Sequence, residues 1–559
     1  MPRLASMVIA ALALAFAVSA HAGITVRHPE IAALYGSSQP EAATAFAELG
    51  GYALPTNSSY LRPPADGKAE QVVVNYQSAG EVVISWVVGH SSVCNDHTCA
   101  AVPVAPAGSD VVRYGSTKSS LKSRAYGAGG YYSQDYYFPA SLNVTGVSDS
   151  SQFNYTSARI YSARLTGLKS ATRYYYSLGK DSTVRSFKTT PRKGAFPLRI
   201  GSMADIGISV NATETIRKMG LSNPDLLLIV GDFAYANLFD FRGVLNYIPV
   251  VARGLTYSYQ PRWDALGRML EGVTGRVPVL TTQGNHEMEL QSDGSMFKAW
   301  LSRFGWNSPY SKSEGTPFYY SANVGPVHMV SISPYVDFVP GTAQYDWLVR
   351  DLSNVDRSVT PWVVAMWHAP WYHTFASHYK ELECHRLAVE PLLYKYGVNV
   401  ALHGHVHGYE RTLKVYDQVE NACGTVYLTA GNAGVGLNTD FADSESLTLY
   451  SRPTSYDNST NCTRPVTTNA TLIYIAGGKI CRTSDPVSGK YCPNTQPSWS
   501  ARREAAHGFV TLDFLSPTRA VIKYFRNLAP DGEATESVEL TRDLSCANQI
   551  RKPRNVQRQ

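Results

Sequence analysis

Long apolar runs and concentrated charge are both missing from this sequence of 559 residues. Beyond the N-terminus, no window offers the ~20 uninterrupted apolar residues that a membrane-spanning helix needs, which argues against a membrane protein. The formal net charge is only +6, and basic residues cluster only in a short tail at 551–558. A nucleic-acid-binding role therefore lacks the electrostatic patch on which it would depend.

The sequence is instead rich in the residues that build large cores. Apolar residues make up 44% of the chain and aromatic residues 11%, which excludes a disordered or collagen-like protein. Since a domain averages roughly 150 residues, a chain of this length allows three or four domains.

The first 22 residues have the pattern of a secretory signal peptide. Arg3 precedes an apolar run at 7–18, and Ala20-His21-Ala22 matches the small-x-small pattern that signal peptidase reads. The apolar run is too short to cross a bilayer. We expect cleavage after Ala22, an N-terminal extension over 23–68 and a secreted protein.

Cysteines and glycosylation motifs agree with export. The eight cysteines allow up to four disulfides in an oxidising compartment. Cys94 and Cys99 are expected to form a local pair, and the other pairings stay open. Seven Asn-x-Ser/Thr motifs predict a glycoprotein: Asn57, Asn143, Asn154, Asn211, Asn458, Asn461 and Asn469.

The first half of the remaining chain has a strand pattern. Short alternating runs at 72–76, 82–88 and 157–165 are separated by Gly/Ser-rich turns, which predicts a β-sandwich over 69–191. The segment 165–176 resembles the tyrosine-corner segment of fibronectin type III domains, in which a Tyr hydroxyl binds upstream backbone. Residues 189–194 are expected to form an interdomain linker.

Beyond residue 194 the pattern changes to compact apolar runs that alternate with helical segments. The apolar runs lie at 198–203, 226–230, 277–281, 327–332, 362–366 and 398–402, and the helical patterns at 343–352 and 386–396. Strands buried on both faces and alternating with helices predict an α/β domain over 195–545. Runs at 509–514 and 520–524 predict a closing β-hairpin before a basic tail at 546–559.

Potential metal ligands follow the apolar runs one after another. They are Asp205, Asp232, Asn285, His368, His405 and His407. Since ligands of open α/β sheets gather beyond the carboxyl ends of the strands, we expect these side chains to converge. Their oxygen and nitrogen donors suit hard and borderline cations, and a carboxylate such as Asp232 can bridge two of them. Two adjacent cations can hold a phosphoryl group and convert a bound water to hydroxide.

With Tyr235 three residues after Asp232, the set of motifs resembles that of the purple acid phosphatases, a branch of the metallophosphoesterases. The resemblance covers 70–515 and includes the segments 404–411 and 496–502. It implies an α/β metallophosphoesterase core, with β-sheets sandwiched by helices, preceded by an all-β fibronectin type III-like sandwich as in the high-mass, plant-like form. One departure is Ala204, where the family usually has Gly.

The resemblance also implies a ligand set for each of two cations. The Fe(III) site would contain Asp205, Tyr235, His407 and, as a bridge, Asp232. The site for a divalent Zn, Fe or Mn ion would contain Asn285, His368, His405 and the same Asp232.

Two further histidines are implied to act on substrate. His286 directly follows Asn285, and His378 lies ten residues after His368. Without such support, His373 is expected at the surface, and Glu287 is expected to support its loop. Structural or solvated roles are expected for His97, His328, His385, His403 and His507.

The implied activity is that of a secreted acid phosphatase acting on phosphate monoesters. Metal-bound hydroxide would attack phosphorus while His286 or His378 assists the leaving group. A phosphodiesterase or nucleotide pyrophosphatase on the same metals is the alternative within the enzyme class. A glycosylated binding protein with a vestigial site is disfavoured, because loss of function usually erodes at least one ligand. The physiological ester and a homodimer stay open.

Overall fold

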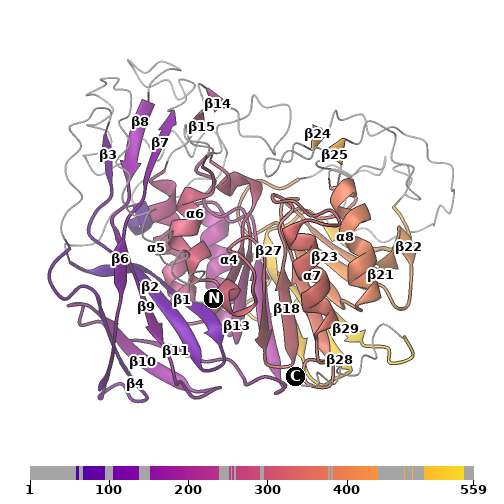
Figure 1. Ribbon diagram of the computed structural model, residues 1–559, viewed down its shortest axis with the longest axis horizontal. Coiled ribbons are helices and arrows are strands. Elements are labelled where there is room, and N and C mark those ends of the chain that lie inside the picture. The colour runs from indigo at the N-terminus through magenta and orange to yellow at the C-terminus, as the bar shows by residue number, and fades with distance from the viewer. Residues whose placement is uncertain are drawn as a thin grey trace, which may run out of the picture.

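The computed structural model (Figure 1) describes residues 58–61, 67–94, 105–137, 152–237, 251–252, 255–256, 260–289, 295–375, 378, 382–438, 471–472, 481–482 and 496–546. Several predictions fall outside these residues: the signal peptide, the Cys94–Cys99 pair, His97, the basic tail and five of the glycosylation motifs. Within the described part of the chain, no helix is long and apolar enough to span a membrane.

The front domain is an antiparallel β-sandwich, as the alternating runs predicted. One layer contains β1 (Ala69–Ser78), β2 (Glu81–Val88), β9 (Arg159–Leu165) and β6 (Ala128–Gly130), and the other contains β11 (Arg185–Lys188), β10 (Arg173–Leu178), β4 (Val111–Gly115) and β5 (Ser123–Tyr126). A third sheet contains β3 (Ser92–Cys94), β8 (Gln152–Thr156) and β7 (Ser133–Tyr137). Ile84, Trp86 and Phe187 belong to the buried core. The Tyr174 hydroxyl accepts the backbone N–H of Lys169 at 2.9 Å, as in a tyrosine corner.

The first sheet of the catalytic domain is continuous with the front domain. Its parallel strands β12 (Leu198–Met203), β13 (Leu226–Val230) and β16 (Val279–Thr282) are followed by β1, which pairs with β16 in parallel at Asn75 and Val279. On the far side it continues through β27 (Gly508–Phe514), β28 (Arg519–Arg526) and β29 (Glu536–Thr541). The expected C-terminal hairpin therefore has a third strand.

The second sheet lies against the first. Its order is β17 (Tyr320–Val324), β18 (Val327–Ser331), β19 (Trp362–Met366), β20 (Val400–His403), β23 (Thr425–Ala430), β21 (Tyr409–Tyr416) and β22 (Val419–Glu420), with β26 (Ser500–Glu504) paired to β21. Strands β18, β19, β20 and β23 are parallel neighbours. Short pairs are formed by β14 (Val251–Ala252) with β15 (Leu255–Thr256) and by β24 (Thr471–Leu472) with β25 (Cys481–Arg482).

Two cores result from the alternation of side chains along each buried strand. In β13, Leu226, Leu228 and Val230 belong to the core between the sheets, whereas Leu227 and Ile229 belong to the core shared with the helices. Helices α4 (Val210–Leu221), α5 (Arg262–Thr274) and α6 (Lys298–Arg303) lie on one side of the domain, and α7 (Ala343–Ser353) and α8 (Glu383–Lys395) lie on the other (Figure 1). Single 3-10 turns are η1 (Ser59–Leu61), η3 (Asn285–Glu287), η4 (Gly305–Asn307) and η5 (Pro309–Lys312). The sheets are sandwiched by helices, as the resemblance implied.

Residues 189–194, expected to form an interdomain linker, lie between β11 and β12, and the segment begins with buried residues. Thr189 and Thr190 are each only 1% exposed. The N–H of Thr189 donates to the carbonyl of Thr172 at 3.0 Å, and the carbonyl of Thr190 accepts from Ala171 at 2.9 Å. The start of the segment is thus packed, whereas Arg192 and Lys193 are exposed.

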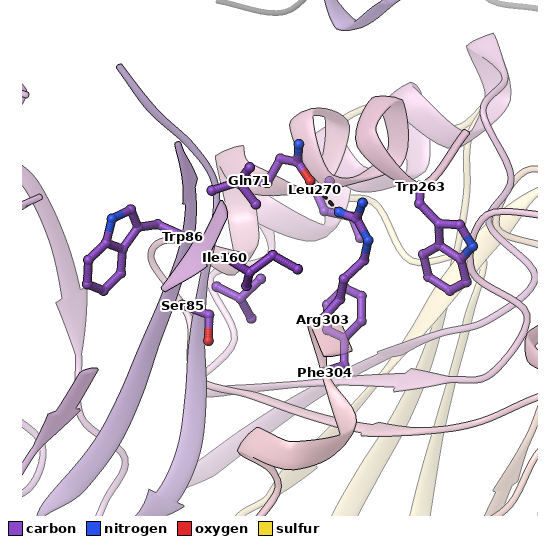
Figure 2. A pocket seen from close by; sticks show the side chains of 11 residues that line it. Gln71, Ser85, Trp86, Ile160, Trp263, Leu270, Arg303 and Phe304 are labelled. Atoms are coloured by element: carbon purple, nitrogen blue, oxygen red, sulfur yellow. Dashed lines mark hydrogen bonds between the residues drawn. The ribbon is translucent and has the colours of Figure 1, made fainter. Parts of the chain in front are cut away.

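A buried polar cluster joins the front domain to the catalytic domain, and Figure 2 shows its contact between Gln71 and Arg303. Arg303, at the end of α6, donates to Oε1 of Gln71 at 2.6 Å and lies 2.8 Å from Oδ1 of Asp264 in α5. The Tyr155 hydroxyl from β8 donates to the other Asp264 oxygen at 2.9 Å. The front domain therefore supplies hydrogen-bond partners for buried charges of the catalytic domain.

A disulfide ties the end of the described chain to the second sheet. Cys423 and Cys546 are bonded, across a sequence separation of 123 residues. Cys546, which the sequence reading placed at the start of the basic tail, is therefore covalently attached to the catalytic domain.

Candidate metal centre

Each predicted ligand lies just beyond the carboxyl end of a strand. Asp205 follows β12, Asp232 follows β13, Asn285 opens η3 after β16, His368 follows β19, and His405 and His407 follow β20. The structure brings five of them together from both sheets: Asp205, Asp232, His368, His405 and His407. Asn285 directly precedes His286, whose N–H donates to Oδ1 of Asp232 at 3.0 Å. Their meeting place is the edge where parallel strands of open sheets collect ligands.

The backbone of these loops is held in an uncommon conformation. Positive φ angles occur at Asp205 (58°), Asp232 (52°), Tyr235 (50°), His378 (63°) and His405 (67°). For non-glycine residues this region is disfavoured by roughly 1–2 kcal/mol each. Such strain persists where the surrounding structure enforces it, and it is concentrated at functional sites.

Close packing explains the glycines beside these ligands. A Cβ on Gly231 would lie 2.4 Å from Nδ1 of His368, and one on Gly404 would lie 2.3 Å from Oδ2 of Asp205. Neither position has room for a side chain, so the loops can approach one another only with glycine there.

The donor atoms converge on a small buried volume. Nε2 of His368 lies 3.0 Å from Oδ2 of Asp232 and 3.8 Å from Oδ1 of Asp205. The Tyr235 hydroxyl lies 2.8 Å from Oδ1 of Asp205, 3.3 Å from Oδ2 of Asp232 and 2.9 Å from Nε2 of His407. Asp232, His368 and His405 each offer an atom within 4.8 Å of the others. These side chains surround a space that suits cations.

The histidine tautomers also fit a metal centre. Nδ1 of His368 lies 2.7 Å from the carbonyl of Val230, and Nδ1 of His407 lies 2.6 Å from that of Gly436. A carbonyl only accepts, so both Nδ1 atoms carry hydrogen, and in the neutral rings the Nε2 lone pairs face the carboxylates. A lone pair and a carboxylate that face each other repel, and a cation placed between them would remove this repulsion.

The protein alone compensates its buried negative charge by protonation. Burial lowers the pKa of His368, but Asp232 and Asp205 more than offset this and raise it to about 9. Burial, followed by Asp205, raises the pKa of Tyr235 well above its usual value. Burial and then His378 hold the pKa of His405 well below its usual value, so that its imidazole is neutral and able to ligate.

Glu287 supports the Asp232 loop, as the sequence reading expected. Its carboxylate accepts the N–H groups of Asp232 and Phe233, both at 2.8 Å, and of Gly284 at 2.7 Å. Burial, and then Asp232, raise its pKa to about 8. Both of its carboxylate oxygens accept backbone N–H groups, so Glu287 has a structural role.

The two proposed substrate histidines lie beside the ligands. His286 contacts Asn237 through Nδ1 at 2.6 Å, and its Nε2 lies 3.9 Å from Oδ2 of Asp232. The His378 ring lies 4.0 Å from that of His405, centroid to centroid. Both rings are partly exposed, so they can meet a ligand that approaches from solvent.

One histidine prediction is wrong, and three supporting residues were missed. His373 is 2% exposed rather than at the surface, and its Nε2 lies 3.1 Å from the carbonyl of His378. His328, His385 and His403 are buried structural residues. The sequence did not identify three supporting residues. Asn237 contacts Nδ1 of His286, Asn438 accepts the N–H of His407 at 2.7 Å, and Glu410 accepts the N–H of Thr374. No local pattern marks such long-range partners.

The two packed sheets, with candidate metal ligands beyond the carboxyl ends of their strands, define the chain as a metallophosphoesterase. Residues 198–409 match the family model of calcineurin-like phosphoesterases, and 69–189 match that of the purple acid phosphatase N-terminal domain. The chain is 35% identical to purple acid phosphatase 15 of Arabidopsis thaliana over 485 residues, which cover 85% of each protein. It is 38% identical to purple acid phosphatase 23 of the same plant over 389 residues, 67% of this chain and 81% of that one.

The fold comparison agrees with the sequence comparison. The purple acid phosphatase PPD1 from yellow lupin (Lupinus luteus) seeds matches with a TM-score of 0.58 at 18% identity, over 87% of this chain and 76% of that one. The chain belongs to the purple acid phosphatase family and is an acid phosphatase.

Proposed function

We propose that this enzyme is a secreted, binuclear-metal phosphatase that hydrolyses phosphate monoesters. The proposal rests on the convergence of carboxylate, phenol and imidazole donors from four loops on one buried space. Membership of the purple acid phosphatase family argues against the alternative of a vestigial binding protein.

Two overlapping ligand sets are assigned in this proposal. Asp205, Tyr235, His407 and Asp232 would hold Fe(III), and Asn285, His368, His405 and Asp232 would hold a divalent Zn, Fe or Mn ion. The contacts of Tyr235 with Asp205 and His407 support the first set. The proximity of Asp232, His368 and His405 supports the second. When bound, two such cations neutralise phosphate charge and lower the pKa of a coordinated water toward neutrality.

The chain's own residues would orient the ester and move protons. Asp232 stands between the two ligand sets, and its loop is fixed by Glu287. His286 and His378 are the partly exposed groups beside the ligands, so either can donate a hydrogen bond to phosphate or a proton to the leaving oxygen. The contact of His286 with Asn237 fixes its ring orientation.

Secretion is supported by the disulfide between Cys423 and Cys546, because such bonds persist mainly in oxidising compartments. Of the glycosylation motifs, Asn154 and Asn211 lie in the described part and are partly exposed. Intact mass spectrometry of protein secreted by a eukaryotic host should show a chain that begins near Gly23 and carries glycans. A chain that retains Met1 with all thiols free would refute this part of the proposal.

The substrate class can be tested directly. Purified enzyme should release phosphate from an aryl phosphate monoester at acidic pH, with a much lower rate on the matching bis-aryl phosphodiester. A clear preference for the diester would replace the monoesterase with the phosphodiesterase alternative. Metal analysis of the same sample shows whether an inactive preparation simply lacks its cations.

A further inference from the structure

We propose that His373 is a positioning residue for His378. The inference rests on the substrate role proposed above for His378. Nε2 of His373 lies 3.1 Å from the backbone carbonyl of His378. Because a carbonyl only accepts, Nε2 carries the hydrogen and donates it. The donor is 2% exposed and comes from within the same loop.

The charge state of His373 supports a single tautomer. Burial, and then the neighbouring His378 ring, lower its pKa to about 3. The imidazole is therefore neutral throughout the working range of an acid phosphatase, and its one ring hydrogen stays on Nε2. The bond to the His378 carbonyl does not depend on pH in that range.

The next residue anchors the same loop to the second sheet. The N–H and hydroxyl of Thr374 donate to Oε2 of Glu410, in β21, at 2.7 and 3.1 Å. The Ser500 hydroxyl donates to Oε1 of Glu410 at 2.6 Å, and Arg503 donates to the Thr374 hydroxyl at 3.0 Å. All four residues are buried. The start of the loop is thus fixed through strands distant in sequence.

Phe375 completes the anchor. It is fully buried and packs with Val406, which lies between two proposed ligands. A Cβ on Gly408 would lie 2.3 Å from its ring, so the ring sits directly on that backbone. Three consecutive side chains, at 373–375, therefore point into the protein while His378 lies beside the ligand cluster.

The hydrogen bond from His373 is accepted by a residue whose backbone conformation is unfavourable. His378 has a φ of 63°, a conformation disfavoured for non-glycine residues. A donor on its own carbonyl fixes the peptide plane that follows this turn. The imidazole ring, 4.0 Å from that of His405, is held in place as a result. Loss of the donor would let the peptide turn and displace the ring from the substrate.

The test uses the full-length, metal-loaded enzyme and five variants. His373→Leu removes the donor at similar volume, whereas His373→Gln keeps an N–H group that can reach the carbonyl. His378→Ala and the double variant His373→Leu/His378→Ala complete a double-mutant cycle. His328→Leu is the matched control, because His328 is also a buried histidine but is bonded to Asp351 and Asn323. The readouts are metal content, melting temperature, kcat/KM and the affinity for inorganic phosphate.

We expect His373→Leu to lower kcat/KM by about 10- to 100-fold, because small misplacement of a catalytic group costs up to ~10². Metal content should be unchanged, and His373→Gln should recover most of the loss. In the His378→Ala background, the same change should alter kcat/KM by less than about twofold, since coupled residues are not additive.

Equal losses from His373→Leu in both backgrounds, or an equal loss in His328→Leu, would show a purely structural role and overturn the proposal. Unchanged kinetics in His378→Ala would overturn it as well, because nothing would remain to be positioned, yet would leave the metal-dependent activity in place. Failure of the proposed function itself would look different: the wild type would release no phosphate from a monoester even with both metals bound.

Discussion

The hydroxyl of Tyr235 donates a 2.8 Å hydrogen bond to Oδ1 of Asp205, a residue 30 positions earlier in the chain. The two residues follow β13 and β12, which are parallel neighbours, so the alignment of strand ends brings them together. The cost of ionising the buried phenol beside a carboxylate is high. A cation of high charge at this position would reverse that cost.

Tyr235→Phe should therefore abolish the visible absorption that a phenolate gives when it ligates Fe(III), while the divalent metal stays bound. Absorption spectra and metal analysis of the purified protein measure both. Tyr76→Phe is the control, since the Tyr76 hydroxyl is also buried but donates to the carbonyl of Asn323. An iron-containing wild type whose visible band survives Tyr235→Phe would contradict the assignment.

The interdomain cluster predicts a strong effect on stability. Arg303→Met leaves Asp264 buried and without the charge that compensates it, a change that typically costs ~3–5 kcal/mol. Arg519→Met is the matched control, because its ion pair with Glu539 is half exposed and contributes little. Urea unfolding should show a large fall in the midpoint for Arg303→Met alone. Equal midpoints in the two variants would mean that the buried pair contributes no more to stability than an exposed one.

Glu410 predicts a pH dependence of stability. Burial raises its pKa from 4.5 to about 7, although Ser500, Arg503 and Thr374 lower it. The folded state therefore binds the proton more tightly than the unfolded state. The resulting stabilisation is complete below pH 4.5 and is lost as the pH rises to about 7, by an amount on the order of 3 kcal/mol.

Glu410→Gln, which resembles the protonated acid, should match the wild type in melting temperature near pH 4.5 and exceed it above pH 7. Thermal unfolding of both proteins across this range measures the difference. A gap that stays constant with pH would refute the shifted pKa.

Local sequence patterns were sufficient for the strands and loops that carry the metal site. The runs at 198–203, 226–230 and 362–366 coincide with β12, β13 and β19. Each is apolar because it is buried on both faces, and a proposed ligand lies two residues after the end of each strand. The apolar run therefore predicts the strand, and the end of the run predicts where the polar residue follows.

Long-range pairing could not be predicted in the same way. The contact of β1 with β16 joins the front domain to the catalytic sheet, but both strands have the pattern of any buried strand. His373 was expected at the surface because the resemblance gave it no role, and its burial depends on tertiary packing. The burial of Thr189 and Thr190 likewise depends on their backbone partners Thr172 and Ala171, which precede the neighbouring strand β10.

In the proposed metal centre, Asp232 binds both cations. Metal analysis of the purified wild type, Asp232→Asn and Asp351→Asn tests this assignment most directly. The Asp351 carboxylate is bonded to His328 and takes no part in the proposed centre. We predict two metal ions per chain in the wild type and in Asp351→Asn, and nearly complete loss of both in Asp232→Asn, since the amide lacks the charge that holds two cations together. Retention of both metals by Asp232→Asn would contradict the account.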